Sequence, residues 1–532
     1  MAEELEDVRV SIVGGSEWGQ SILVDKVQRA LQRGSTKIHI IHGYVVDTNS
    51  DVRVLTGPVI GEVTMDSAFI LLEVQGQDKY TPVTCRLYKD PEHDEPVAEV
   101  SLELKAKRPS TFQFHDLEPN TRYTAVFNGV CKYNATYRMA HFKTKSENVE
   151  HFRILALSCD RPSRLLLGQQ DPWMNMLKRI ATVDVVLHVG DQIYPDNEDI
   201  AHADAIFGQL YDGLSADKQR SMMLRGRELW RSKYRSVFSR EGKVEVLANC
   251  SNLMIWSDND VANDFTTMRK ADGSQMYHPN FLQCGMRTYR EYQRKLWDPD
   301  CSLQLEEETK EWHQHIYGPV GIFMCDLRGN RISGSGQQEA ENTLLSDEQW
   351  SHIESLFVNP EIKVIILCSE TPFVGDEPSV CRQKVADNPS MDFLRDHWPY
   401  NEDELVRLLD LCFNWKAAGE AEAIQRDVLL IGGDIHCGVT SVIRDDDTGL
   451  QINQLTTSPV TNHVCKFFPP SEGVINQRYN FSHLPLGQKF RNYADIQISI
   501  DEDSVNVLGQ LIPVSTDIFK DTTWQVEDSE EE

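Results

Sequence analysis

The sequence predicts an α/β fold preceded by an all-β sandwich module. Over residues 151–515, continuous runs of β-branched and other apolar residues alternate with helical stretches, which is typical of an α/β fold with a buried central sheet. Over residues 51–147, short alternating runs are separated by polar or Pro/Gly turns, which predicts a small β-sandwich. No apolar run approaches the roughly eighteen residues of a transmembrane helix, so the sequence predicts no membrane span.

The two ends of the chain differ from these regions. Residues 1–50 predict a strand (VRVSIV), a helix (LVDKVQRALQR) and a second strand (KIHIIHGYVV), because the apolar positions of the middle stretch have helical spacing. The glycines between the first strand and the helix fit no phosphate-binding motif, so we expect a plain turn there. Residues 520–532 are predicted to be an acidic, disordered tail.

Acidic residues outnumber basic ones by 82 to 53, which gives a formal net charge of −29 over 532 residues. Phosphate groups would be repelled by this charge, so the composition argues against a general nucleic-acid binder or an anionic-membrane binder. A small phosphate substrate stays compatible, because a metal ion can supply positive charge locally. The segment MAEELEDVRV lacks the features of a signal peptide, and the twelve cysteines form no CxxC pair, so we expect a cytoplasmic protein with reduced thiols.

The segment FQFHDLEPNTRYTAVF within residues 51–147 resembles the fibronectin type III pattern. In that pattern a leucine, a turn and a tyrosine pin the last strands, and here these are Leu117, residues 119–121 and Tyr123. The resemblance implies a spacer or a docking surface for a protein partner. No activity follows from it.

The predicted strands of residues 151–515 end at residues that can bind metals. These strand ends carry Cys159 and Asp160; Asp191 and Tyr194; Asp258, Asn259 and Asp260; and Asp434 and His436. Ligands of open α/β folds bind beyond the carboxyl ends of strands, and carboxylates gathered there repel one another unless a cation neutralises them. A single Asp after a strand is more often a helix cap or a turn residue. Four such ends in one chain predict a metal site.

The order of these motifs resembles that of the calcineurin-like metallophosphoesterases, and within them of the PhoD-type alkaline phosphatases. The segments HVGDQIYPD, FMCDLRGNR, DHWPYNEDELVRLL and INQLTTSPVTN are similar to segments of that family, and the resemblance covers residues 151–515. It implies a two-sheet metallophosphoesterase sandwich flanked by helices (α/β/β/α), with a binuclear metal centre at the strand ends.

The resemblance also implies a set of metal ligands. Cys159, Tyr194 and His436 would hold a ferric ion, and Asp191 would bridge the two metals. Asp258 and Asp434 would hold calcium or another divalent ion such as magnesium or manganese. Thiolate and phenolate suit a strongly Lewis-acidic ion, and oxygen ligands suit a hard cation. Two alternatives stay open, a packed strand thiol at Cys159 and a core tyrosine at Tyr194.

The implied reaction is hydrolysis of a phosphomonoester or phosphodiester by a metal-bound hydroxide, with Asp191 and Asn259 in the catalytic site. Relatives commonly carry a histidine where this chain has Asn259, which holds no ionisable proton but can donate a hydrogen bond to a phosphate oxygen. Either the leaving group needs no acid, or His463 or His397 substitutes. The alternative function is a catalytically silent protein that binds phosphate ligands or acts as a scaffold.

Two further sets of residues are candidates. Arg328 could clamp a phosphate, or it could pair with Asp326 and lock the strand end, and His463 is a second candidate for substrate binding. His313 and His315 have ligand-like spacing, but we expect them in a connecting segment with a surface or packing role.

Overall fold

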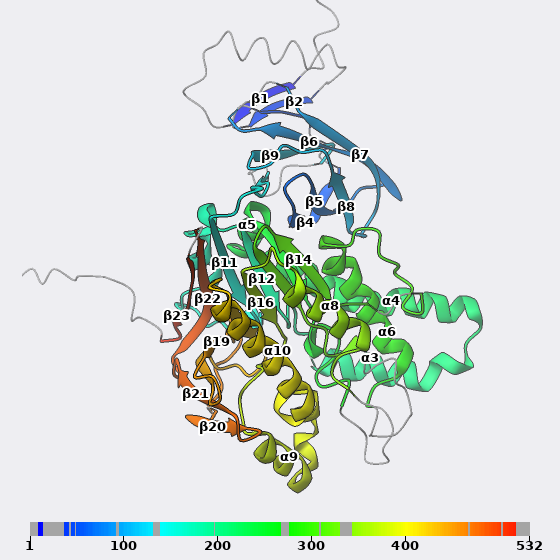
Figure 1. The fold of residues 1–532 in the computed structure, drawn as a ribbon. Coiled ribbons are helices and arrows are strands. Elements are labelled where there is room, and N and C mark those ends of the chain that lie inside the picture. Colours follow the sequence, from blue (N-terminus) through cyan, green and yellow to red (C-terminus); the bar gives the residue numbers. More distant parts are fainter. Residues whose placement is uncertain are drawn as a thin grey trace, which may run out of the picture.

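A computed structural model describes residues 9–13, 37–41, 44–47, 49, 51–91, 95–130, 139–195, 197–267, 276–307, 310–329, 343–466, 469–501 and 504–517. Strands β1 (Arg9–Val13), β2 (Lys37–Ile41) and β3 (Tyr44–Asp47) form a small sheet of their own. The predicted helix over residues 23–33 and the predicted tail over residues 520–532 lie outside the described residues. Figure 1 shows a β-rich module above a larger α/β domain.

The module consists of two facing antiparallel sheets. One has the order β4 (Arg53–Val63), β5 (Ala68–Gln75), β8 (Ser110–Phe114), and the other has β10 (Ala140–Lys143), β9 (Arg122–Asn128), β6 (Tyr80–Lys89), β7 (Ala98–Lys105). Alternating apolar side chains of both sheets, such as Ile70 and Leu87, share one core. The Tyr123 hydroxyl accepts a hydrogen bond of 2.9 Å from the Glu118 amide and so pins the turn before β9. The resemblance to fibronectin modules stays a prediction.

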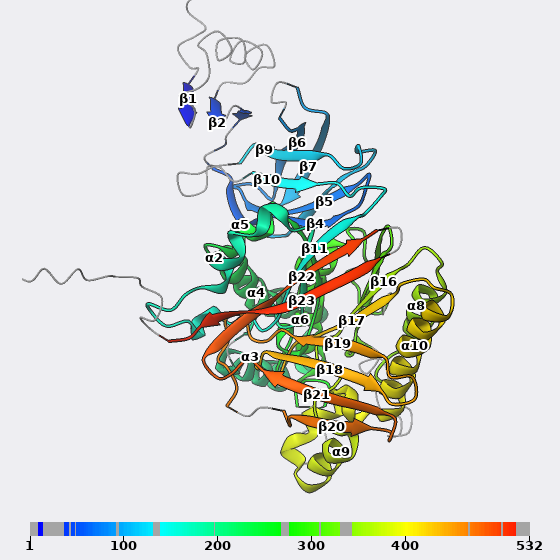
Figure 2. The same ribbon diagram turned by 60° about the vertical axis from the view of Figure 1, so that its left-hand side comes forward.

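The larger domain contains two sheets. The first has the order β13 (Ser251–Ile255), β12 (Val185–Val189), β11 (His151–Leu157), β22 (Phe490–Ile500), β23 (Val505–Ser515). The second has the order β14 (His313–Tyr317), β15 (Val320–Met324), β16 (Val364–Cys368), β17 (Asp427–Gly432), β19 (Gln451–Thr456), β18 (Val439–Asp445), β21 (Tyr479–Pro485), β20 (Glu472–Ile475), and Figure 2 shows its strands from β16 to β20 following one another in this order. Strands β11 to β13 are parallel, as are β15, β16, β17 and β19.

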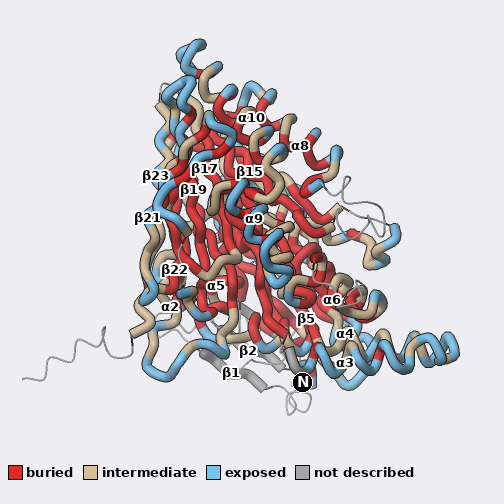
Figure 3. The backbone as a smooth tube through the Cα atoms, turned by 90° about the horizontal axis from the view of Figure 1, so that it is seen from below, coloured by how far each residue is buried: buried red, intermediate tan, exposed pale blue. Residues whose placement is uncertain are grey.

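Side chains alternate between the two faces of each strand. Each sheet therefore packs against the other sheet on one face and against helices on the other, which gives four layers. In β11, Ile154 and Ala156 point into the core between the sheets, while Leu155 and Leu157 point outward. The outward face of the first sheet is covered by α2 (Pro172–Leu177) and α5 (Lys243–Asn249). The second sheet is covered by α8 (Asp347–Val358) and α10 (Glu402–Ala421). The predicted α/β/β/α arrangement is confirmed, and Figure 3 shows the buried residues concentrated in the strands.

The remaining helices lie in the segments that follow strands. The α-helices are α3 (Asn197–Leu210), α4 (Ala216–Phe238), α6 (Pro279–Tyr292) and α9 (Pro378–Asp387). The short 3₁₀ helices are η1 (Pro162–Arg164), η2 (Ile180–Thr182), η3 (Tyr211–Gly213), η4 (Asp258–Asp260), η5 (Arg294–Leu296), η7 (Pro389–Asp396) and η8 (Trp398–Tyr400). Among the helices that the structure describes, none combines the length and apolar character needed to cross a membrane.

The module is fixed to the α/β domain by buried polar contacts. The Glu73 carboxylate of β5 accepts hydrogen bonds from Arg235 of α4 at 2.7 and 3.0 Å and from Tyr292 of α6 at 2.6 Å. At β13, Ser251 and Asn252 donate to the backbone carbonyls of β4.

The expectation that His313 and His315 lie in a connecting segment is wrong. Both side chains are buried in β14 at this module interface, where His315 contacts Glu62 at 2.6 Å. Polar residues at every second position also fit a strand, because they all lie on one face of it. In β14 this polar face is covered by the β-sandwich module.

Candidate metal centre

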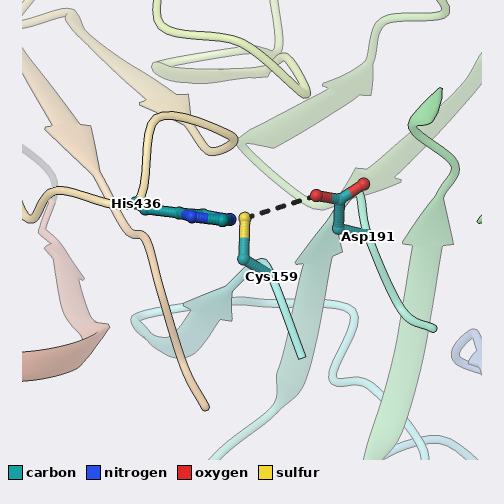
Figure 4. Close-up of side chains that lie close together, drawn as sticks. All are labelled: Cys159, Asp191 and His436. Atoms are coloured by element: carbon teal, nitrogen blue, oxygen red, sulfur yellow. Dashed lines mark hydrogen bonds between the residues drawn. The ribbon is translucent and has the colours of Figure 1, made fainter. Parts of the chain in front are cut away.

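Four strand ends of the α/β domain meet at one place. The chain reaches Cys159 after β11, Asp191 after β12, Asp258 after β13 and Asp434 after β17. Strands β11, β12 and β13 are parallel neighbours and present their carboxyl ends on the same side of the first sheet. The packing of the second sheet on the first brings the end of β17 to the same place. Two overlapping groups, each with one ligand atom per residue and all atoms within 4.8 Å of one another, could hold metal ions: Cys159, Asp191 and His436; and Asp191, Asp258 and Asp434. Figure 4 shows the first group.

The backbone at this site is held in the left-handed region. The φ angles are 59° at Cys159, 60° at Asp191, 63° at Asp434 and 52° at His436, values that non-glycine residues rarely adopt. Such strain persists only where the surrounding structure enforces it, and it is concentrated at functional sites. Here it turns the side chains sharply at the strand ends and toward one another.

Steric contacts require a glycine before Asp191 and before Asp434, at positions 190 and 433. A Cβ at Gly190 would lie 2.8 Å from the Ser257 Cβ, and a Cβ at Gly433 would lie 2.7 Å from the Val189 carbonyl oxygen. Neither contact is tolerable for a real side chain. Only glycine therefore allows the ends of β12, β13 and β17 to approach closely enough to group the carboxylates.

Asp191 is at the centre of the site. Its Oδ2 lies 3.5 Å from Cys159 Sγ and 3.5 Å from Asn259 Nδ2, and the Tyr194 hydroxyl donates a hydrogen bond to it. Its buried Oδ1 has no hydrogen-bond partner among the described residues. Burial raises the pKa of Asp191, and the charges of Asp258 and Asp434 raise it further. A buried oxygen without a donor, beside two more carboxylates, fits a bound cation.

One half of the centre combines sulfur, nitrogen and oxygen donors. The Tyr194 hydroxyl lies 3.2 Å from His436 Nε2, and burial followed by the charge of Asp191 raises the pKa values of Cys159 and Tyr194. Burial, with a smaller effect of His463, lowers the pKa of His436 to about 3, so its ring is neutral, the form that binds metals. This donor set fits a transition metal such as iron.

The second group of potential ligands, Asp191, Asp258 and Asp434, consists of carboxylates. Burial raises the pKa of Asp434 to about 7, and the charge of Asp258 adds to this effect. Asp258 Oδ2 accepts a hydrogen bond of 2.7 Å from the Asp264 amide, which orients the carboxylate. Carboxylate oxygens without sulfur or nitrogen donors fit a hard cation such as calcium or magnesium.

Asp260 supports the site without belonging to either group. Its carboxylate accepts hydrogen bonds from the backbone amides of Asp191 and Gln192 at 3.0 Å each and of Ser257 at 2.9 Å. These bonds join the ends of β12 and β13. The motif pattern placed Asp260 near the site, but this contact between two strand ends is visible only in three dimensions.

The three residues predicted to contact substrate all line one cavity of about 480 Å³ together with the metal centre: Asn259, Arg328 and His463. The Asn259 amide lies 3.3 Å from Asp258 Oδ1. The His463 ring is perpendicular to the His436 ring, with centroids 4.7 Å apart. Arg328 is buried, and its ion pairs with Glu370 and Asp396 are both 2.7 Å long. Its role in binding substrate stays a prediction.

Arg161 and Asn462 are among the cavity residues that the sequence analysis did not single out. The Arg161 guanidinium lies 5.4 Å from the centroid of the Tyr194 ring, and Asn462 Nδ2 lies 3.1 Å from His436 Nε2. Both had a signal, since Arg161 follows Cys159 by two residues and Asn462 ends the INQLTTSPVTN segment. An arginine and an amide are common in loops, so the signal was weak.

Comparison with known proteins adds four findings. A family model described as PhoD-like phosphatase matches residues 154–502. A solved structure of PhoD is similar with a TM-score of 0.59 and 14% identity, over 88% of this chain and 92% of that one. A purple acid phosphatase from yellow lupin (Lupinus luteus) seeds aligns with a TM-score of 0.47 and 12% identity, over 86% of this chain and 71% of that one, which is too low to support a conclusion. No curated protein matches the sequence.

Proposed function

The chain belongs to the PhoD-like phosphatase family, and on that premise we propose that it hydrolyses small phosphate esters at a binuclear metal centre. One observation carries this proposal. Two groups of three potential ligands share Asp191, so a single carboxylate can bridge two ions. A shared carboxylate is what a two-metal site requires, because the ions of such sites lie about 3.5–4 Å apart.

We propose Cys159, Tyr194 and His436 as ligands of a ferric ion, and Asp258 and Asp434 as ligands of calcium or another divalent cation. When bound, two such ions supply positive charge to the phosphate and lower the pKa of a water nucleophile. The neutral His436 ring is ready to bind without losing a proton. The Asn259 amide, beside Asp191 and Asp258, can donate a hydrogen bond to a phosphate oxygen.

The test joins metal analysis to hydrolysis of an activated phosphomonoester and phosphodiester. We expect two metal ions per chain, hydrolysis of at least one ester, and an iron–tyrosinate absorption band that is lost in Tyr194→Phe. Asp212→Asn, in an exposed position of η3, is the matched control and should keep both metals. A protein that carries no metal at any of the proposed ligands would refute the assignment.

A silent phosphate-binding protein or scaffold of the same fold is the second candidate, and Asn259 favours it because it cannot donate an ionisable proton. General acid–base assistance typically contributes about 10²–10⁴-fold to a rate. If the loaded protein binds phosphate and both it and Asn259→His show no hydrolysis, the silent function is supported. If the wild-type protein hydrolyses either ester, the proposed phosphatase activity is supported.

Two predictions about the cellular context remain. The cysteines of the described residues are free thiols, which is compatible with the cytoplasmic location we propose. A protein partner of the β-sandwich module also stays a proposal. Only one of its sheets, β4-β5-β8, provides the contacts to α4, α6 and β13 described above, which leaves β7 as an edge strand of the other sheet.

A further inference from the structure

The cavity at the metal centre is larger than a phosphate needs, and one of its walls is apolar. It has a volume of about 480 Å³. Ligand pockets of this size take a whole small organic molecule. Apart from the candidate ligands and charged groups, the lining includes Pro372, Phe393, Leu394, Pro399, Ile435 and Pro469. Most of this wall comes from residues 372–399, on the segments that follow β16.

The wall is held in place relative to the metal centre. Asn401 donates hydrogen bonds to the carbonyls of Arg395 and His397 at 2.9 and 2.8 Å, which fixes the end of η7. His397 Nε2 lies 3.6 Å from Asp434 Oδ2. The Phe393 ring packs against the His397 ring, with the ring centroids 5.9 Å apart. The apolar surface is therefore formed before substrate arrives, which reduces the entropy lost on binding.

The charges of the lining disfavour a second phosphate group. Arg328 is paired with Glu370 and Asp396, and Lys384 is paired with Asp376 at 2.6 Å. The lining also contains the Arg161 guanidinium and the Asp264 carboxylate, which have opposite charges. Within the described part of the chain, the cavity walls beyond the metal centre therefore carry no surplus of positive charge. A nucleoside diphosphate, a nucleoside triphosphate or a polyphosphate brings additional negative charge that this lining does not balance.

The chemistry at Asn259 points in the same direction. Its amide stands beside Asp191 and Asp258 and cannot protonate a leaving oxygen. A phenol-type oxygen, whose pKa is near 10 as in tyrosine, leaves without a proton far more readily than an alkoxide. An aromatic leaving group also matches Phe393 in shape and polarity.

We propose that the preferred substrates are aryl phosphate esters with one phosphate group, whose ring rests against Phe393, Leu394 and Pro399. This inference rests on the proposed function. In the reaction, the oxygen of water forms a new bond to phosphorus while the bond from phosphorus to the aryl oxygen breaks. One proton of that water stays on the phosphate formed and the other passes to solvent. The bonding pair leaves on the phenolate, which takes a proton from solvent, and the products are hydrogen phosphate and the phenol.

The experiment compares phenylphosphonate with methylphosphonate, two ligands that cannot be hydrolysed, by calorimetric titration of the metal-loaded full chain. We expect phenylphosphonate to bind about tenfold more tightly, since a buried ring contributes at least this much. Phe393→Ala should reduce this preference about fivefold and leave methylphosphonate binding unchanged. Leu394→Ser should act in the same direction. Leu508→Ala, an exposed leucine of β23, is the control and should change neither affinity.

The outcomes separate this inference from the proposed function. Equal binding of the two phosphonates by the wild-type protein would overturn the aryl preference and leave the phosphatase proposal intact. The same holds if Phe393→Ala weakens both ligands equally, or if adenosine monophosphate binds more tightly than phenylphosphonate. Failure of the loaded protein to bind any phosphonate, together with no hydrolysis of an activated ester, would overturn the proposed function itself.

Discussion

Glu73, between the β-sandwich module and α4, and Asp191, in the metal centre, are both buried carboxylates with opposite surroundings. Both oxygens of Glu73 are satisfied by the protein, one by Arg235 and the other by Thr56 and Tyr292. Asp191 has an unpartnered Oδ1 among the described residues, and burial, followed by the charges of Asp258 and Asp434, raises its pKa. Glu73 is paired with the guanidinium of Arg235, whereas Asp191 lies in a group of carboxylates that could hold a metal ion. Burial alone therefore does not distinguish a structural carboxylate from a functional one, whereas its partners do.

The largest expected effect is that of Asp191→Asn. The amide removes the shared ligand, so we expect hydrolysis to fall on the order of 10³-fold, the upper end of what loss of one electrostatic group costs. The stability of the metal-free protein should not fall, because the amide no longer repels Asp258 and Asp434. Rate assays and urea unfolding of the chelated protein measure both effects. A large loss of stability without metal would contradict the comparison.

Glu73→Gln is the matched change at the module interface, and it should have the reverse profile. Breaking one side of a buried ion pair costs about 3–5 kcal/mol, and we expect about 3 kcal/mol because Arg235 keeps its contact with Glu228. Activity per folded molecule should stay within twofold, since Glu73 lies in the module and outside the cavity lining. Denaturant unfolding at pH 7 measures the loss. Unchanged stability would show that the pair is not needed for docking.

The candidate metal centre should also make the stability of the metal-free protein depend on pH. Burial raises the pKa of Asp434 to about 7 in the folded state, and an unfolded aspartate titrates near 3.9. Between these values the folded protein binds a proton that the unfolded chain does not, so stability falls as pH rises from about 4 to 7. We expect this slope in chelated protein and a shallower one in metal-loaded protein. Asp434→Asn should flatten the slope of the chelated form, and an unaltered slope would contradict the assignment.

The candidate metal site could be predicted because its carboxylates directly follow buried strands, whereas the role of each proposed ligand came from the resemblance to the PhoD-type phosphatases. Asp191 and Asp434 each follow a strand and a glycine, and ligands of α/β folds bind beyond the carboxyl ends of strands, although these two strands lie in different sheets. Glu73 gave no such signal, because its partner Arg235 is 162 residues away and lies on another domain. His313 and His315 were misplaced for the same reason. Their polar pattern is explained by the module that covers them, and only the folded chain shows that cover.

The smallest expected effects come from two buried hydroxyls that each donate to a carboxylate. Thr56 Oγ1 donates to Glu73 at 3.1 Å, and Ser257 Oγ donates to Asp258 at 3.0 Å. Thr56→Val should lower stability by about 1 kcal/mol, the usual net worth of one hydrogen bond, and leave metal binding unchanged. Ser257→Ala should instead weaken the second metal about tenfold, because groups that orient metal ligands contribute about 10–100-fold to affinity.

Titration of the second metal and denaturant unfolding of both variants decide this pair. If Ser257→Ala lost stability and kept its metal affinity, the Asp258 hydroxyl contact would be structural, like the one at Glu73. The difference between the two regions would then begin at the carboxylates themselves and not in the groups that orient them.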